Sequence, residues 1–224
     1  MLRYDFRKNN EARSIRHELG VVIEAEGSCK YYQGNTIVTA FLNSLTTNKT
    51  LKQERFDRSS LQVKISTGSD DIKKNKFAED YIYKSILPAI KSLNYPRKQF
   101  VLTIIVIHDD GSSIACATNA SVLALFNAGI SMVSVPISVC VLKQSDNTMI
   151  FDPTLNEEIN DFSDLHIFTF ADISSKVSII CSSIFQRTSH DTSPQSITDK
   201  NQLQAEIVMN AIDLAKSIFN MCFH

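Results

Sequence analysis

A turn rich in acidic and hydroxyl side chains is the first place where this sequence could carry chemistry. Residues 108–113 read His-Asp-Asp-Gly-Ser-Ser and separate an apolar run from a run of small and aliphatic residues. A helix that begins after Gly111 would offer backbone N–H groups, and Ser112 and Ser113 would offer hydroxyl groups, to a bound anion. The more ordinary interpretation, which we favour, is that the two serines are the N-cap and first-turn residues of the helix.

Two carboxylates six positions apart form a second candidate site. Asp152 and Glu158 could hold a divalent cation or act as a general acid. His108 and the two acids that follow it could also bind a metal ion. We favour a structural role for the acid pair and a solvated turn for His108, so we expect neither a metal nor a cofactor.

Basic side chains are concentrated in the first half of the chain. Residues 1–100 hold 18 Lys and Arg against 11 Asp and Glu, a net charge of +7, whereas residues 101–224 hold 5 against 13, a net charge of −8. Such an asymmetry suggests a basic surface that faces a polyanion, but on this feature alone we favour solvated surface charge. Lys52, Arg55 and Arg58 lie in a polar loop, and Arg97 follows a proline.

The elements that must position these residues are predicted from hydrophobic periodicity. Strands are expected at 21–23, 31–32, 36–42, 61–65, 99–107, 133–142, 165–170 and 177–184. Helices are expected at 77–93 with a bend at Pro88, at 112–127, and from about residue 198 onward. The second helix is apolar nearly all round and should be buried on more than one side. The sum is an α+β fold, with an N-terminal arm at residues 1–17 and a single domain at residues 18–224.

Composition excludes several classes of protein. The five cysteines form no C-x-x-C pair and no zinc-ligand spacing, which argues for a reducing compartment and against a structural metal. The first residues carry no secretory signal, and no segment has the roughly 20 apolar residues that a membrane span needs. Glycine-rich nucleotide loops and the common hydrolase motifs are missing from the sequence. We expect a soluble, intracellular protein.

The stretch from His108 to Met132 resembles the RNase PH family. In that family a strand ends in Asp-Gly, a small-residue helix follows, and the helix closes on Ala-Leu-x-x-Ala-Gly-Ile-x-Met. Three more segments occur in the family's order, and together they cover roughly residues 10–165: Glu26-Gly27-Ser28 with Gln33-Gly34-Asn35-Thr36, Tyr95-Pro96-Arg97, and Phe151-Asp152-Pro153-Thr154 with Glu157-Glu158.

The resemblance implies an RNase PH-like fold of the ribosomal protein S5 domain 2-like type, with mixed β-sheets packed with helices. It also implies a degenerate site at Gly111, Ser112 and Ser113. Active members continue Gly-Ser/Thr with a phosphate-binding Arg, where this sequence has Ser113. The stretch 70–76, before the first helix, lacks the family's second Arg, and Glu158 replaces an Asp of the acid pair with Asp152.

The pattern is most similar to the non-catalytic ring subunits of the eukaryotic RNA exosome, in the branch related to the archaeal catalytic subunit. The resemblance then implies six RNase PH-like chains in a ring, cap subunits, a separate hydrolytic nuclease and single-stranded RNA as partners, without a membrane. It implies a nuclear, nucleolar and cytoplasmic location. Lys52, Arg55 and Arg58 would face the ring channel, and Arg97 would contact RNA or a neighbouring subunit. An active phosphate-dependent 3′→5′ exoribonuclease and a binding module outside any exosome remain alternatives.

Overall fold

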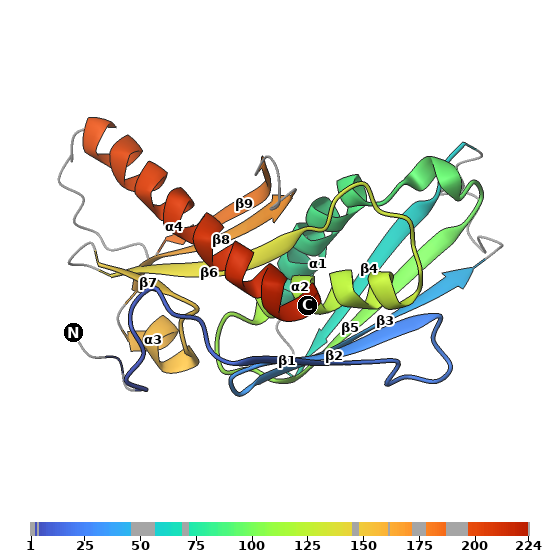
Figure 1. Ribbon diagram of the computed structural model, residues 1–224, viewed down its shortest axis with the longest axis horizontal. Coiled ribbons are helices and arrows are strands. Elements are labelled where there is room, and N and C mark those ends of the chain that lie inside the picture. Colours follow the sequence, from blue (N-terminus) through green and yellow to red (C-terminus); the bar gives the residue numbers. More distant parts are fainter. Residues whose placement is uncertain are drawn as a thin grey trace.

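Two β-sheets lie side by side, with one long helix across them (Figure 1). The computed structural model describes residues 3, 5–45, 57–68, 72–144, 148–160, 162–171, 178–186 and 197–223. In this part of the chain, no helix is long and apolar enough to cross a bilayer.

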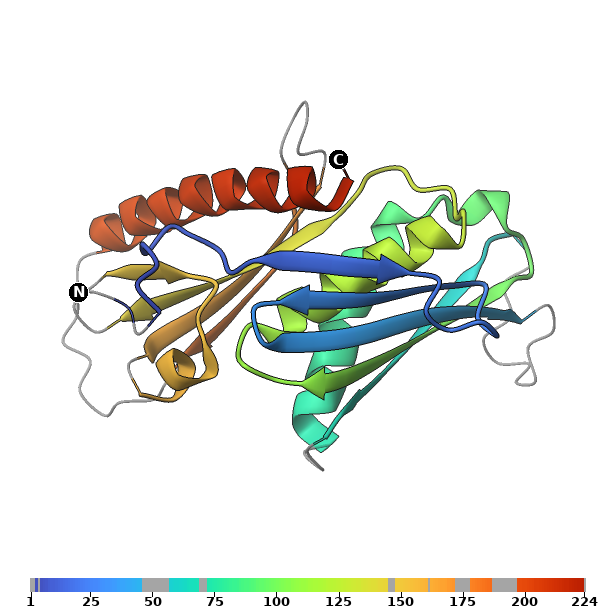
Figure 2. The ribbon, with the colours of Figure 1, turned by 60° about the horizontal axis from the view of Figure 1, so that its bottom comes forward.

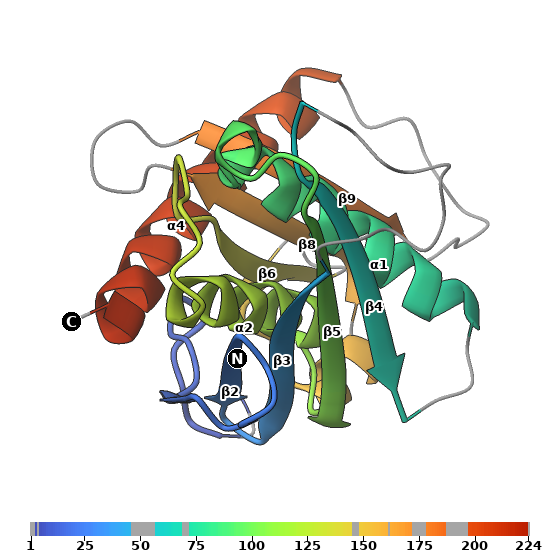
Figure 3. The same cartoon turned by 90° about the vertical axis from the view of Figure 1, so that its right-hand side faces the viewer.

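The first sheet has the order β1-β2-β3-β5-β4. Its strands are β1 (Ile15–Leu19), β2 (Gly27–Gln33), β3 (Thr36–Leu45), β5 (Gln99–His108) and β4 (Ser60–Thr67). All neighbours are antiparallel except β4 and β5, which run parallel. Alternation along the strands directs Tyr31, Val38 and Leu102 to the buried face, where α2 (Ser113–Asn127) covers the sheet (Figure 3).

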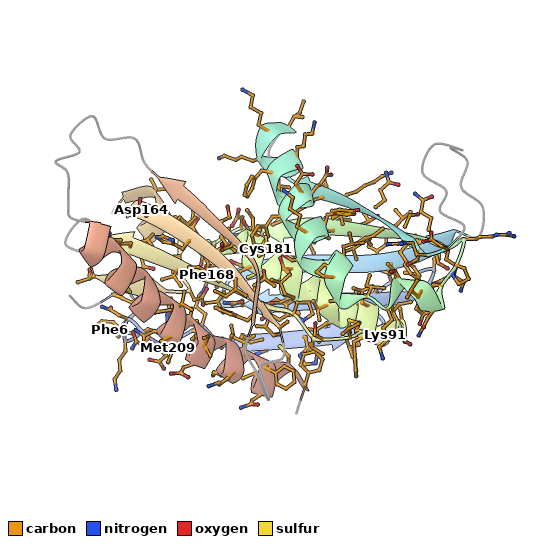
Figure 4. All side chains as sticks on the ribbon, turned by 90° about the horizontal axis from the view of Figure 1, so that it is seen from above. Phe6, Lys91, Asp164, Phe168, Cys181 and Met209 are labelled. Carbon is orange, nitrogen blue, oxygen red and sulfur yellow. The ribbon has the colours of Figure 1, made fainter. Side chains whose placement is uncertain are left out.

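The second sheet is antiparallel and has the order β7-β6-β8-β9, from β7 (Met149–Phe151), β6 (Ile137–Gln144), β8 (Phe162–Ala171) and β9 (Ser178–Gln186). The long α4 (Ile197–Phe223) covers one face, while α1 (Ile72–Ile86) and α2 meet the other (Figure 2). Figure 4 labels Phe168 and Cys181 on the neighbouring strands β8 and β9 and the exposed Met209 on α4. The short α3 (Leu155–Asn160) connects β7 to β8.

Helix α2 is the element that joins the two sheets. Every residue from Ala115 to Leu125 is buried, which confirms the prediction of a helix covered on more than one side. Its Asn119 donates to the Ser138 carbonyl oxygen at 3.0 Å and accepts from the Ser138 N–H at 2.8 Å. A buried amide that bonds a strand in both directions fixes the register of α2 against β6.

Several predicted elements are confirmed, but some of their bounds and details were wrong. Helix α1 begins at Ile72 and not at residue 77, and β6 begins at Ile137 and not at residue 133. No strand forms at residues 21–23. The first strand is β1 instead, and it begins inside the stretch that we expected to be an arm, because residues 15–19 pair in register with β2. Helix α1 ends at Ile86, and Pro88 sits in a separate 3₁₀ turn, since proline has no N–H to continue the helix. Periodicity missed β7 and α3, which are too short to show a repeat.

Candidate functional site

A pocket of about 550 Å³ lies where α2 begins, and this size is usual for small-molecule sites. Its polar lining includes Asp109, Ser112, Ser113 and Glu158, with Lys73 and Lys74 from the first turn of α1. Apolar side chains form much of the remaining wall: Ile65, Phe77, Ala78, Val106, Ile114, Ala115, Leu155, Leu165 and Ile167.

The turn that leads into α2 is held tightly against the segment before α3. Gly111 has a φ of +90°, and a Cβ there would lie 2.5 Å from the Pro153 carbonyl oxygen, so both the conformation and the space require glycine. Ser112 adopts a left-handed φ of +55° and donates its hydroxyl to the same oxygen at 3.1 Å. Ser112 is the N-cap residue of α2, as predicted. Its side chain bonds Pro153 and makes no capping hydrogen bond to the helix.

Glu158 accepts a hydrogen bond from the backbone at the start of α2. The Ser112 N–H, at the start of α2, donates to Oε1 of Glu158 at 2.7 Å. The pKa of Glu158 is raised to about 7: burial is the largest cause and the nearby charge of Asp109 adds to it, while the hydrogen bond from the Ser112 N–H opposes them. The donors of a helix N-terminus attract anions, and here a side chain of the chain itself already uses one of them.

Asp152 is bound by Arg13 and is not among the residues that line the pocket. Its carboxylate accepts from the Arg13 backbone N–H at 2.7 Å, from Nε at 3.0 Å and from Nη2 at 2.7 Å. Burial raises the pKa of Asp152, but the hydrogen bonds and the charge of Arg13 outweigh it and hold that pKa below its ordinary value. The same guanidinium donates to the carbonyl oxygens of Asp110 at 2.6 Å and Gly111 at 3.2 Å.

A second buried ion pair joins Arg3 to Glu157. Nε and Nη2 of Arg3 donate to the two carboxylate oxygens at 2.9 and 2.8 Å, in the parallel geometry that suits guanidinium and carboxylate. Arg3 also donates to the carbonyl oxygens of Phe151 and Asp152 at 3.0 Å each. Burial raises the pKa of Glu157, but the bonds from Arg3 and from the Thr154 N–H outweigh it, so the pKa lies below its usual range.

The predicted site residues thus fall into separate groups. Ser112, Ser113 and Glu158 line one pocket and Gly111 shapes its entrance turn, whereas Asp152 belongs to the Arg13 pair. His108 Nδ1 lies 2.9 Å from the Asn35 carbonyl oxygen. Within the described ranges, no group of three or more His, Cys, Asp or Glu side chains is placed to hold a metal ion.

Two of the predicted RNA contacts, Arg58 and Arg97, are described by the structure, and neither lines the pocket. Arg58 is exposed and forms an ion pair with Asp57 at 2.8 Å, and Arg97 is exposed with a φ of +60°. Lys52 and Arg55 lie outside the described residues. Sequence reasoning missed Arg3, Arg13 and Glu157, because no local pattern links partners that lie 139 and 154 positions apart.

A match to a known protein family agrees with the two-sheet fold and with the Gly111 turn. Residues 11–131 match the RNase PH family, described as the 3′ exoribonuclease family, domain 1. This is more than half of the chain, so the chain belongs to that family. The resemblance inferred from the sequence segments, and with it the predicted α+β fold class, is confirmed.

The chain is similar to named exosome proteins in both sequence and fold. The chain is 29% identical over 157 residues to the exosome complex exonuclease RRP46 homolog of Arabidopsis thaliana; the match covers 70% of this chain and 65% of that relative, slightly less than two thirds of its length. The crystal structure of rice (Oryza sativa) Rrp46 superposes with a TM-score of 0.83 at 21% identity, over 98% of both chains. A chain of an archaeal exosome core gives 0.80 at 18% identity, over 99% of this chain and 91% of that one. At such identities the solved structures show a shared fold.

Removal of the Arg13 side chain should destabilise the protein strongly. Arg13→Met removes the closest partner of the buried Asp152 carboxylate and leaves only the Arg7 guanidinium, 3.5 Å away, as an ion-pair partner. Loss of one partner of a buried ion pair costs up to about 3–5 kcal/mol of unfolding free energy. Urea unfolding followed by circular dichroism would measure it. Arg16→Met, on the exposed side of β1, should change stability by less than about 0.5 kcal/mol.

The double variant Arg13→Met/Asp152→Asn separates the charge effect from lost packing. Asparagine tolerates the φ of +50° at this position and can still accept from the backbone N–H of residue 13. It should recover at least about 1 kcal/mol relative to Arg13→Met, because the buried carboxylate charge that Arg13 had balanced is gone. A double variant no more stable than the single one would show that packing, and not the ion pair, sets the cost.

Glu158 should make stability depend on pH in the direction opposite to Asp152. Its folded pKa of about 7 lies above the ordinary 4.5, so its contribution is greatest below the lower value and is lost as pH rises through the higher one. Glu158→Gln keeps an acceptor for the Ser112 N–H but removes the charge. The variant should therefore gain stability relative to the natural chain between about pH 5 and pH 8. Equal differences in urea midpoint at the two pH values would contradict this.

Proposed function

We propose that this chain is a structural, RNA-guiding ring subunit of the RNA exosome that supports 3′→5′ RNA processing and degradation without its own catalysis. The observation that carries the proposal is the Glu158 carboxylate bound to the Ser112 N–H at 2.7 Å. It uses a helix N-terminal donor where phosphorolysis would need inorganic phosphate. Family membership and the exosome names of the relatives support the same assignment.

The charges of the pocket support the loss of catalysis. Ser113 stands where active members of the family have an Arg, and the cations in the described lining are Lys73 and Lys74. A lysine is a point charge and does not offer the two parallel donors with which a guanidinium holds phosphate. The loss of one such Arg costs on the order of 10²–10³ in rate. Inorganic phosphate would also meet the carboxylates of Asp109 and Glu158.

The partners follow from the same proposal. They are other RNase PH-like exosome subunits in a six-membered ring, cap subunits, a separate hydrolytic nuclease and single-stranded RNA, in the nucleus, nucleolus and cytoplasm. Large apolar side chains are exposed at several places, among them Ile23 at 96% and Val133 at 64% in connecting segments and Ile107 at 56% on β5. Exposed apolar surface favours contact with other chains, which would bury it.

Guidance of RNA is assigned to the loop with Lys52, Arg55 and Arg58, which by resemblance to the family faces the ring channel. Phosphate contacts from such a loop would position a strand without reading its sequence. Arg97, which stands on a separate exposed turn, is proposed as a further contact to RNA or to a neighbouring subunit.

The pure chain should release no nucleoside diphosphates from a 3′-hydroxyl RNA in the presence of Mg²⁺ and phosphate. The assay would follow product by thin-layer chromatography, with an active RNase PH enzyme as the positive control. Release that is robust and disappears in Glu158→Ala would establish the alternative, an active phosphate-dependent exoribonuclease.

Charge reversal in the basic loop should weaken RNA binding in the assembled ring and leave assembly intact. Replacing Lys52, Arg55 and Arg58 with Glu should remove phosphate contacts and change stability little, because substitutions in polar segments outside the core usually have small effects. Crosslinking to labelled RNA at two salt concentrations should fall and lose part of its salt dependence.

A matched triple variant controls for net charge by placing the same reversal at exposed lysines on other elements, namely Lys84, Lys91 and Lys216. This variant should keep the natural crosslinking. Loss of assembly in the loop variant, with crosslinking per ring unchanged, would instead place the loop in a subunit interface.

A further inference from the structure

Strand β4 lies at the edge of the first sheet and has one described neighbour. It pairs with β5 in parallel, and the Ser60 N–H donates toward that side, to the Lys98 carbonyl oxygen at 3.0 Å. In a parallel ladder, alternate residues direct their N–H and C=O groups to opposite sides. The groups of Ser59, Leu61, Val63 and Ile65 therefore point to the open side of β4.

At two of these four positions, the outward N–H group already donates a hydrogen bond within the chain. The Ser59 N–H donates to the Ser92 carbonyl oxygen at 3.0 Å, and the Ile65 N–H donates to Oε1 of Glu79 at 3.0 Å. Between these ends, no hydrogen bond from the described part of the chain reaches the outward groups of Leu61 and Val63. The edge thus presents a short window of two N–H donors and two C=O acceptors.

A groove of about 730 Å³ runs along this window. One wall is the strand itself, residues 58–63. The other is the outward side of α1 and the turns that follow it, which lie beside β4 in Figure 3 and contribute Glu79, Asp80, Tyr83, Leu87, Pro88, Ile90 and Ser92. An added strand needs backbone groups to hydrogen-bond and side chains to contact. The wall formed by β4 offers the backbone groups, and the opposite wall offers acidic and apolar side chains.

The charges of the groove indicate which kind of strand would fit. Asp80 is exposed on the α1 wall, and Glu79 adds a second carboxylate. Arg58, at the end of the groove, is paired with Asp57 at 2.8 Å and does not cancel them. An acidic groove repels RNA phosphates and attracts lysine and arginine side chains.

We propose that the β4 edge binds an extended basic segment of a partner protein by strand addition. The segment would exchange backbone hydrogen bonds with Leu61 and Val63. Its basic side chains would meet Asp80, and its apolar side chains would pack on Tyr83 and Leu87. This site lies apart from the pocket at α2 and does not depend on the proposed exosome role.

The test uses the full chain and a fluorescein-labelled peptide, Thr-Lys-Val-Arg-Val-Lys-Thr, with binding measured by fluorescence anisotropy. Hydrogen exchange should show that the peptide protects the amides of Leu61 and Val63. Two further peptides carry N-methyl groups on alternate residues, in the two possible phases. Only one phase faces β4 in an added strand, so one should bind more than about tenfold more weakly and the other should bind as the parent does.

Side-chain variants test the charge part of the proposal. Asp80→Lys should weaken binding at least about threefold, as expected for loss and reversal of an exposed charge pair. Glu24→Lys, an equal reversal in the exposed turn before β2, should leave binding unchanged. A peptide with Glu in place of Lys and Arg should not bind.

Three results would overturn the inference. Equal affinity for both N-methylated phases would show that the peptide is not held as a strand. Protection outside β4 would place it elsewhere on the chain. Binding of an oligouridine RNA that competes with the peptide, and that Asp80→Lys does not weaken, would assign the groove to nucleic acid.

Discussion

The buried pair of Arg13 and Asp152 is the interaction on which the arrangement of the site depends. An uncompensated charge in this position would be costly, and the pair avoids that cost because each carboxylate oxygen accepts from Arg13 and the guanidinium also bonds the carbonyl oxygens of the turn before α2. The segment before β1 is thereby tied to two distant parts of the chain. Arg3 and Glu157 form a similar buried ion pair, which ties residue 3 to the first turn of α3. The position of α3 in turn brings Glu158 to the Ser112 N–H.

The two acids that looked like one site in the sequence have opposite environments. Arg13 surrounds Asp152 with donors and lowers its pKa, whereas burial without a cation in bonding distance raises the pKa of Glu158. The first carboxylate therefore stabilises the fold as an ion, and the second lines a largely apolar pocket while it uses a helix donor. The two acids that match the family's acid pair therefore have different structural roles, one in an ion pair and one at the start of α2.

Local patterns were enough for the elements, but not for the partners. The run of small residues from Ser113 to Asn127 predicted a helix buried on both sides, since no polar stripe remains for solvent. The shift of the first strand from 21–23 to Ile15–Leu19 could not be predicted in this way, because pairing with β2, and not apolar content, selects the strand. The same holds for Asp152 and Glu158: six positions of separation say nothing about which side chain an arginine 139 positions away will bind. The motif located the turn at Gly111 but gave no sign that Glu158 accepts a hydrogen bond from the next residue, Ser112.

The fold reduces the charge asymmetry of the sequence, because some charges of the two halves pair with each other. Arg3 and Arg13 belong to the basic half and are buried against Glu157 and Asp152 of the acidic half. With these four charges paired internally, the halves present +5 and −6 to the surface in place of +7 and −8. The remaining basic charge is not uniform either, because Glu79 and Asp80 make the β4 edge locally acidic within the basic half. A polyanion and a basic peptide can therefore be drawn to different parts of the same half, and only the charges that the fold leaves unpaired can guide either of them.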